Sequence, residues 1–492
     1  QVDELRRIGR IYYKRLNQNK AAEDYFNKAL FFLRAGLLDI PALIKEAKDS
    51  KVRQLLKEDA LQLKHLETKT LLDLGLVRER TGDFNRALEY YEEAGSLAKN
   101  INDKDALTLI SLYKANSYWF QADYQNAFNS VRKALKIAEK QRNKEHLLQA
   151  YNTMGLIFWT LNDLVKAKSN LKKSLDLAEE INSKLDIASA YNNLGLIYRQ
   201  EKKYQESIEH FEKALAIDKK LKTKWGRGYD HRNIGMSYLR LGDLEKAVLN
   251  IEKAVNLSSE IGNRINEAKS MLEMGNVHLK KGEGKYRKAI HYFTNTYSMS
   301  KNINLPEVSW RALKGKGKSY WMLGDNEQAL KNYKEAVGIV ENMRASIKLE
   351  EFRNGFIENK QDLYKELILL MLETGEKEAA FNYSERARAR SFIDLLGNHK
   401  LDFKNMSDQE TYSKIQNLKQ QIHETKETLR DAEDEDFAKN NAKLTSLQNS
   451  LQDLLIELKE KDPQLSSFVT VDPMKIDEVY GLLDPGVALV EY

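Results

Sequence analysis

Residues 235–254 read GMSYLRLGDLEKAVLNIEKA, and this stretch contains the signals that decide the fold. Glycine in a left-handed conformation often ends one helix and aspartate often caps the next, so Gly242-Asp243 predicts a tight turn between two helices. Ala247 and Ile251 are four residues apart and therefore lie on one face of the second helix. The stretch predicts a pair of antiparallel helices.

The same series of a small residue, a turn, an alanine and a large apolar residue recurs along the chain. Successive copies are about 40 residues apart, with a two-residue insertion near Glu283-Gly284. Small residues are suited to places where two helices cross closely. Seven copies are visible, and their first small residues are Gly75, Ala115, Gly155, Gly195, Gly235, Gly275 and Gly317. The repetition predicts a stack of similar helix pairs.

The composition agrees with a helical chain and excludes several classes of protein. The 492 residues include only 24 Gly and 5 Pro, and hydrophobic residues make up 42%, which is enough for a core. Cysteine is absent, so disulfides, thiolate metal sites and a cysteine nucleophile are excluded within these residues. The formal net charge of +6, from 79 Lys and Arg against 73 Asp and Glu, is not typical of a dedicated nucleic-acid binder.

The distribution of apolar residues and histidines bears on location and cofactors. The chain has no run of about 18 apolar residues, and no charged-then-apolar signal peptide opens it. Its first residue is Gln1 rather than methionine, which suggests a trimmed stretch. We expect a cytoplasmic protein without a membrane span. The 8 His lack metal-ligand spacing, so we expect neither a metal nor a cofactor, and the sequence specifies no oligomeric state.

The recurring pattern resembles the tetratricopeptide repeat, in a long form with an extended second helix. The resemblance covers residues 66–340 and implies an all-α superhelix, or α-solenoid, in which each repeat contacts its neighbours. We expect a degenerate repeat and irregular helices around Pro41 in residues 1–65. Residues 341–397 are expected to hold another degenerate repeat and an arginine-rich junction.

In this family the first helix of each repeat lines the concave side, which implies a groove for a partner. The groove residues counted in this way include no carboxylate, although the first repeat departs from the pattern with Glu79. Asparagine amides bind an extended peptide backbone and Arg and Lys favour carboxylates, so we expect an acidic protein or peptide partner. The alternative is that these residues form solvated faces and ordinary helix packing. The expected groove residues are Asn116, Trp119, Asn152, Trp159, Asn192, Arg199, Arg232, Arg240, Asn276, Lys280, Arg311, Lys314, Lys318 and Trp321.

The chain changes character after the repeats. Residues 398–463 contain apolar residues at heptad-like spacing, such as Leu447 and Leu454, and the acidic stretch 431–436 lies between two such runs. This pattern predicts an antiparallel helical hairpin with a charged turn. In residues 464–492, prolines, a short amphipathic stretch and a terminal run of β-branched and aromatic residues predict a helix followed by a strand.

A second resemblance concerns residues 384–396, SERARARSFIDLL, and the ending 482–492, LLDPGVALVEY. The first is similar to the segment that joins tetratricopeptide arrays to CHAT domains, and the second to the opening helix and strand of a CHAT domain. CHAT domains are caspase-like cysteine peptidases with a His–Cys dyad on an α/β sheet. The resemblance implies that residues 464–492 begin such a domain and that its sheet continues beyond Tyr492. Because the chain has no cysteine, no catalytic residue is assigned in it.

Three functions are open from the sequence. The first is a scaffold that binds a partner in its groove and regulates a caspase-like peptidase beyond this chain, in a bacterial defence or signalling system as the CHAT resemblance implies. The second is a peptide-binding adaptor that is not an enzyme. The third is a nucleic-acid-associated scaffold, which the near-balanced charge disfavours.

Overall fold

The computed structural model describes residues 2–13, 18–345 and 360–384, with isolated positions at 347, 356 and between 414 and 454. Regular secondary structure in these residues is helical throughout, which confirms the predicted all-α fold. None of the helices in this described part combines the length and apolarity needed to cross a bilayer. The chain divides into two compact units, residues 1–363 and residues 364–492.

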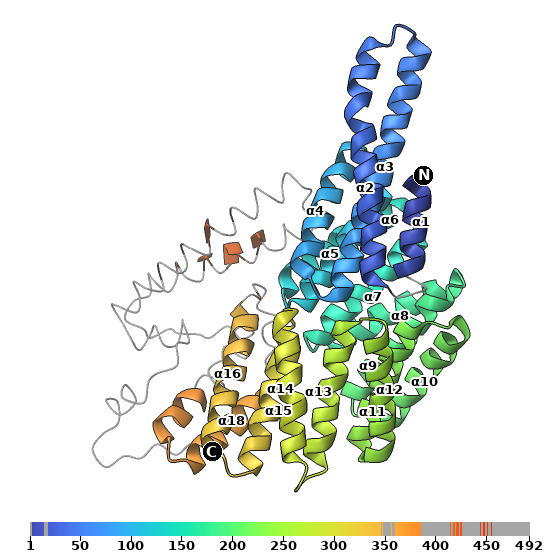
Figure 1. Ribbon diagram of the computed structural model, residues 1–492. Helices are drawn as coiled ribbons and strands as arrows, with labels where there is room; N and C mark the ends of the chain where they lie inside the picture. The colour runs from blue at the N-terminus through green and yellow to red at the C-terminus, as the bar shows by residue number, and fades with distance from the viewer. Residues whose placement is uncertain are drawn as a thin grey trace. The chain divides into compact units, whose positions relative to one another are not determined.

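The first unit is built from successive antiparallel helices joined by short turns (Figure 1). Its helices are α1 (Val2–Ile11), α2 (Asn19–Glu46), α3 (Ser50–Thr81), α4 (Phe84–Asn100), α5 (Lys104–Phe120), α6 (Tyr124–Gln141), α7 (Lys144–Thr160), α8 (Leu164–Glu180), α9 (Lys184–Gln200), α10 (Tyr204–Leu221), α11 (Lys224–Leu241), α12 (Leu244–Glu260), α13 (Arg264–Lys280), α14 (Tyr286–Asn302), α15 (Pro306–Met322) and α16 (Asn326–Ala345). Helix α18 (Gln361–Glu373) begins at the end of this unit and continues into the second.

The turns between helices form as their residues predict. Gly242 has a φ of 93° and ends α11 in the left-handed conformation. The side chain of Asp243 accepts a hydrogen bond from the backbone N–H of Lys246 at 3.0 Å and so caps α12. Where a turn has no glycine, another residue takes the left-handed conformation, as Lys202 does with a φ of 62°. The turn geometry is therefore kept along the array even where its residues vary.

Within a repeat, the small residue of the first helix faces the large apolar residue of the second. A Cβ atom on Gly195 would lie 2.5 Å from the ring of Phe211, and one on Gly235 would lie 2.6 Å from Cγ1 of Ile251. Phe211 and Ile251 are fully buried. Because such close approaches are sterically excluded, glycine allows the two helices to cross nearer than a larger residue would permit.

The odd-numbered helices form the inner side of the array. From α3 to α15, each odd-numbered helix packs against the next odd-numbered one, whereas successive even-numbered helices of the described part do not pack to that extent. Helices that converge on one side and separate on the other produce a curved stack. The odd-numbered helices therefore line the concave side of the superhelix.

The curvature brings the first repeats against the later ones. Phe84, at the start of α4, lies in one core cluster with Ile265 of α13 and Phe293 of α14. Gly82 faces the turn after α14, where an added Cβ would lie 2.6 Å from the Cβ of Ile303. Helix α3 also packs against α13. The array therefore winds far enough for α3 and α4 to contact α13 and α14.

Residues 31–65 differ from the expectation of irregular helices, because α2 and α3 are long and continuous. Figure 1 shows the two as an antiparallel pair whose joined ends project beyond the neighbouring helices. Pro41 lies within α2, but near its C-terminal end, where the missing N–H removes only one late hydrogen bond. Asp49 then caps α3 by accepting a hydrogen bond from the backbone N–H of Lys51 at 2.7 Å. Pairing with a neighbouring helix thus outweighs the local signal of the proline.

Parts of the expected C-terminal organisation lie outside the described residues. They are the arginine-rich segment from 385 onward, the charged turn at 431–436 and the helix and strand expected in 464–492. Within the expected hairpin, isolated described positions such as Leu447 are helical. The assignment of these segments remains a prediction.

Two glycines of similar exposure provide a test of the turn geometry. We expect Gly242→Ala to reduce the free energy of unfolding by about 1–2 kcal/mol, because alanine is strained at positive φ. No atom lies within 4 Å of a Cβ at this position, so the loss comes from the backbone alone. We expect Gly338→Ala, in the interior of α16 and equally open, to raise stability by about 1 kcal/mol. Urea unfolding followed by circular dichroism measures the stability of both variants. Equal changes in the free energy of unfolding would contradict the left-handed conformation of Gly242.

Candidate functional site

All of the residues predicted to line a groove lie on the inner, odd-numbered helices. They are distributed over six helices: Asn116 and Trp119 on α5, Asn152 and Trp159 on α7, Asn192 and Arg199 on α9, Arg232 and Arg240 on α11, Asn276 and Lys280 on α13, and Arg311, Lys314, Lys318 and Trp321 on α15. Most of these side chains are partly buried, and several are hydrogen-bonded to the helix of the next repeat. The inner side is thus a polar surface whose groups are held largely by one another.

Asparagine side chains link successive inner helices. Asn193 of α9 donates from Nδ2 to Oδ1 of Asn152 in α7 at 2.7 Å. Asn233 of α11 donates in the same way to Oδ1 of Asn192 at 2.9 Å. The two bonds connect equivalent positions of neighbouring repeats, and Trp119 adds a similar bond by donating its indole N–H to a threonine of α7 at 2.8 Å. The amides therefore stabilise the stacking of the repeats as well as forming the inner surface.

A group of basic side chains lies beside this row of amides. Arg232 is only 8% exposed and donates from Nη1 to Oδ1 of Asn266 at 2.6 Å. Burial, together with the charge of Arg232, lowers the pKa of Arg199 to about 9. Burial and the charges of Arg232 and Arg311 lower the pKa of Lys269 to about 7. We call Arg199, Arg232, Lys269 and Arg311 the inner cation cluster.

Two carboxylates partly compensate this cluster. Glu273 accepts a hydrogen bond from Nδ2 of Asn276 at 2.9 Å. Glu307 accepts one from Nη2 of Arg311 at 2.7 Å. Burial alone raises the pKa of Glu307, but the charges of Lys360 and Arg311 outweigh it and lower this pKa overall. The four basic groups still outnumber the two carboxylates, so the inner side carries an excess of positive charge.

The other predicted basic residues have different surroundings. Lys280 donates from Nζ to the backbone carbonyl of Leu239 at 2.8 Å and so joins α13 to α11. The ammonium of Lys318 lies 4.1 Å from the ring centroid of Trp321. Arg240 is exposed at the end of α11. Of these three residues, Arg240 lies near enough to the cluster for its charge to contribute to the lowered pKa of Arg199.

Several residues of this surface were not among those predicted. Asn193 and Asn233 occupy equivalent positions of successive repeats, and applying the period to every position of the first helix would have found them. Glu273 occupies the same position of its repeat as Asn193 and Asn233, two residues before the small residue, so the period would have found it as well. The sequence gives no such signal for Lys269. Its surroundings depend on a residue far away in the sequence, Trp119 of α5, whose ring centroid lies 5.4 Å from the Lys269 ammonium.

A pair of buried carboxyl groups underlies the middle of the inner surface. Asp230 of α11 is 1% exposed and Asp218 of α10 is 4% exposed. Asn192 donates from Nδ2 to Oδ1 of Asp230 at 2.5 Å. Burial, followed by the charge of Asp218, raises the pKa of Asp230 to about 9. At neutral pH the pair of carboxyl groups therefore holds a proton, which we assign to Asp230. Among the described residues, no group of His, Asp and Glu has the arrangement of a metal site.

Family models account for the repeats. Models described as the tetratricopeptide repeat match residues 70–105, 105–180, 186–260 and 272–343, which together make up more than half of the chain. The chain belongs to the tetratricopeptide-repeat family. The matches include no CHAT domain, so the CHAT resemblance remains an expectation from residues 384–396 and 482–492. Among curated proteins, none matches this chain.

Two solved structures share the fold of this tetratricopeptide-repeat protein. One is a Rap protein complexed with competence and sporulation factor, which is 16% identical, with 70% of this chain and 98% of that one covered and a TM-score of 0.50. The other is the Rap conjugation gene regulator of the plasmid pLS20 in complex with the Phr* peptide, also 16% identical, with 71% and 98% covered and a TM-score of 0.50. At this identity the likeness establishes the fold.

The protonated Asp230 makes stability depend on pH. Its pKa of about 9 in the folded state is above that of an unfolded aspartate, about 4, so the folded state holds a proton that the unfolded state releases. The stabilisation is complete below about pH 4 and is lost as the pH rises toward 9. We expect Asp230→Asn, which keeps an oxygen acceptor for Asn192, to raise the free energy of unfolding at pH 8 by about 1 kcal/mol or more.

The same substitution at a helix N-cap, Asp243, provides the control. Asp243→Asn keeps a good N-cap residue and is expected to leave the pH dependence above pH 5 unchanged. Urea unfolding between pH 5 and pH 9 measures both variants. An Asp230→Asn protein whose stability falls between these pH values as steeply as that of the parent would contradict the protonated state.

Proposed function

We propose that this tetratricopeptide-repeat protein is a protein-interaction scaffold whose inner surface binds an acidic peptide segment of a partner. The observation that carries the proposal is the excess of positive charge in the inner cation cluster. Arg232 is buried, and Arg199 and Lys269 are partly buried. Charges removed from water are costly unless they are paired, and Glu273 and Glu307 are too few to pair all of the cluster. A carboxylate from a ligand supplies the missing partner, and Arg199 and Arg311 match its geometry with bidentate hydrogen bonds.

The extended form of the ligand is supported by the amides. An asparagine side chain carries both donors and acceptors, and the row from Asn152 to Asn233 runs across successive repeats. A peptide backbone laid along this row can exchange hydrogen bonds with it at regular intervals. The two Rap structures of the same fold contain competence and sporulation factor and the Phr* peptide, and these complexes support a peptide as the kind of ligand.

The proposal predicts loss of binding when the cluster is weakened. We expect Arg199→Gln combined with Arg311→Gln to weaken the binding of an acidic peptide at least about tenfold, since each substitution removes a charge-assisted hydrogen bond. Peptides selected from an acidic library on the parent protein are titrated by isothermal calorimetry. Lys172→Gln on the outer helix α8, whose side chain is exposed, is the matched control and is expected to bind as the parent does.

Proton uptake adds a readout that is specific to this site. A carboxylate bound beside Lys269 raises the pKa of that side chain above its present value of about 7, so binding at pH 7.5 takes up protons. Calorimetry in buffers of different ionisation enthalpy measures this uptake, and Lys269→Met is expected to abolish it. Binding that changes neither in the Arg199→Gln, Arg311→Gln double variant nor in Lys269→Met would place the ligand elsewhere. A steep loss of affinity with salt, together with a preference for polynucleotides over peptides, would instead favour the nucleic-acid-associated scaffold.

A second candidate function is control of a caspase-like peptidase by the repeats. It is favoured by the order of the chain, in which the repeats precede residues 384–396 and the ending 482–492. Both segments lie almost entirely outside the described residues. The CHAT resemblance predicts a His and a Cys on successive strands in the continuation after Tyr492, because such a peptidase needs a thiolate nucleophile and an imidazole base. Sequencing of the gene beyond this point tests it: a continuation without both residues leaves the peptide-binding adaptor as the function.

A further inference from the structure

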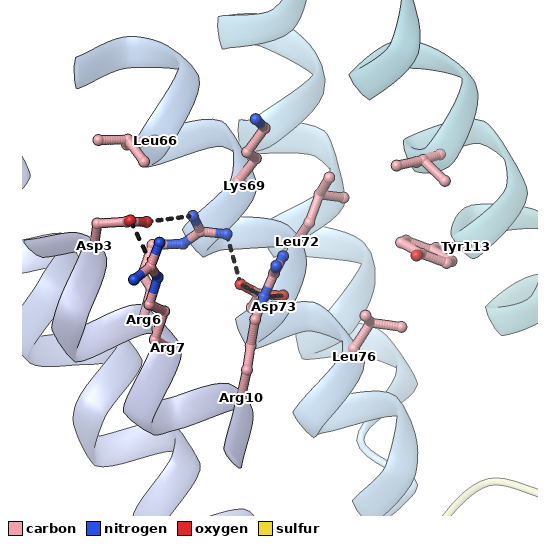
Figure 2. A pocket seen from close by; sticks show the side chains of 11 residues that line it. Asp3, Arg6, Arg7, Arg10, Leu66, Lys69, Leu72, Asp73, Leu76 and Tyr113 are labelled. Atoms are coloured by element: carbon pink, nitrogen blue, oxygen red, sulfur yellow. Dashed lines mark hydrogen bonds and ion pairs between the residues drawn. The ribbon is translucent and has the colours of Figure 1, made fainter. Parts of the chain in front are cut away.

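A separate cavity of about 430 Å³ lies between α1, α3 and α5. Figure 2 shows that basic side chains enter it from both α1 and α3. Arg6, Arg7 and Arg10 come from α1, and Lys69 comes from α3. None of these residues belongs to the inner cation cluster, so an inference from this cavity does not rest on the peptide proposal.

One buried carboxylate holds two of the arginines. Asp73 is 7% exposed and accepts from Nη2 of Arg6 at 2.8 Å and from Nε of Arg10 at 3.0 and 3.1 Å (Figure 2). Arg6 is only 4% exposed, and its Nε has no hydrogen-bond partner among the described residues. The charge of Asp73 is thus shared by two guanidinium groups, and the buried Arg6, whose Nη1 also lies 3.9 Å from Oδ1 of Asp3, is incompletely bonded. This arrangement leaves positive charge uncompensated at the base of the cavity.

The mouth of the cavity adds two further basic groups. Arg7 reaches Asp3 only at 3.4 Å, and its side chain is 79% exposed. Lys69 is exposed and makes no ion pair with any residue that the structure describes. Counting all six ionised groups, four are positive and two, Asp3 and Asp73, are negative. The cavity therefore carries a surplus of two positive charges.

The remaining wall is apolar. Leu72 of α3 and the partly buried Leu109 and Tyr113 of α5 line the side of the cavity that faces away from the arginines. The cavity volume is within the range of pockets that bind small organic molecules. A ligand that fits this wall has an apolar or aromatic body and presents its charge to α1 and Lys69.

We propose that this cavity binds a small phosphate monoester with an apolar body. A phosphate monoester carries a charge of about −1.5 to −2 at neutral pH, which matches the surplus of two positive charges. Its oxygens accept hydrogen bonds from the free Nη groups of Arg7 and Arg10 and from the ammonium of Lys69, while Leu72 and Tyr113 contact the body. The Arg6–Asp73 bond then orients the site without needing to change.

Phenyl phosphate is the probe for the test, with isothermal calorimetry and ligand-observed NMR on the full chain. We expect phenyl phosphate to bind at least about tenfold tighter than inorganic phosphate, which lacks the body, and than phenol, which lacks the charge. Arg7→Gln combined with Lys69→Gln is expected to lower the affinity for phenyl phosphate about tenfold relative to the parent protein. Lys64→Gln, an exposed position of α3, is expected to leave that affinity unchanged. The double variant leaves the hydrogen bonds of Asp73 with Arg6 and Arg10 in place, and its thermal unfolding is expected to match that of the parent.

Three results would overturn the proposal. Phenyl phosphate that does not bind, or that binds no better than inorganic phosphate, excludes a cavity built for a phosphate monoester with an apolar body. An unchanged affinity in the double variant excludes this location. A pentapeptide whose only charged side chain is phosphotyrosine and that binds more tightly than phenyl phosphate excludes a small-molecule ligand in favour of a phosphorylated protein segment.

Discussion

The close crossing of two helices over a glycine is the contact on which the rest of the first unit depends. Gly195 against Phe211 and Gly235 against Ile251 leave no space for a Cβ atom, so each pair of helices is held at a short distance in a defined orientation. Because the same contact recurs in successive repeats, small rotations between repeats accumulate in one direction. The odd-numbered helices converge as a result and form the inner side.

That convergence decides the chemistry of the inner surface. Polar side chains on neighbouring inner helices come within hydrogen-bond distance, and buried polar groups are stable only when they are bonded. Asn152 and Asn193 satisfy this requirement across one repeat boundary, and Asn192 and Asn233 across the next. The arginines and Lys269 find fewer partners in the same space, and the lowered pKa values of Arg199 and Lys269 follow from their burial beside like charges. A scaffold with uncompensated charge on its concave side is suited to a ligand of opposite charge.

Prediction from the sequence succeeded where the deciding interaction is local or repeats with the period. Arg199, Arg232 and Arg311 lie on the odd-numbered helices on which the period places them, whereas their role in binding a partner stays a prediction. It failed at Pro41, where a residue that disfavours helix is accommodated within the long α2. The neutral carboxylic acid of Asp230 was also missed, because its pKa depends on burial and on Asp218, neither of which a pattern of residue types reveals.

The sequence by itself determined the helix pairs and their turns, because the interactions that form them connect residues near one another. Gly242 and Asp243 end one helix and begin the next, and Ala247 and Ile251 define the buried face within the following turns. Only the tertiary structure decided which distant side chains meet. Phe84 packs with Phe293, and Lys269 lies over Trp119, because the small angle between neighbouring repeats adds up over the whole array. That angle arises from the shape of every helix interface together, so no single stretch of sequence specifies where the superhelix returns on itself.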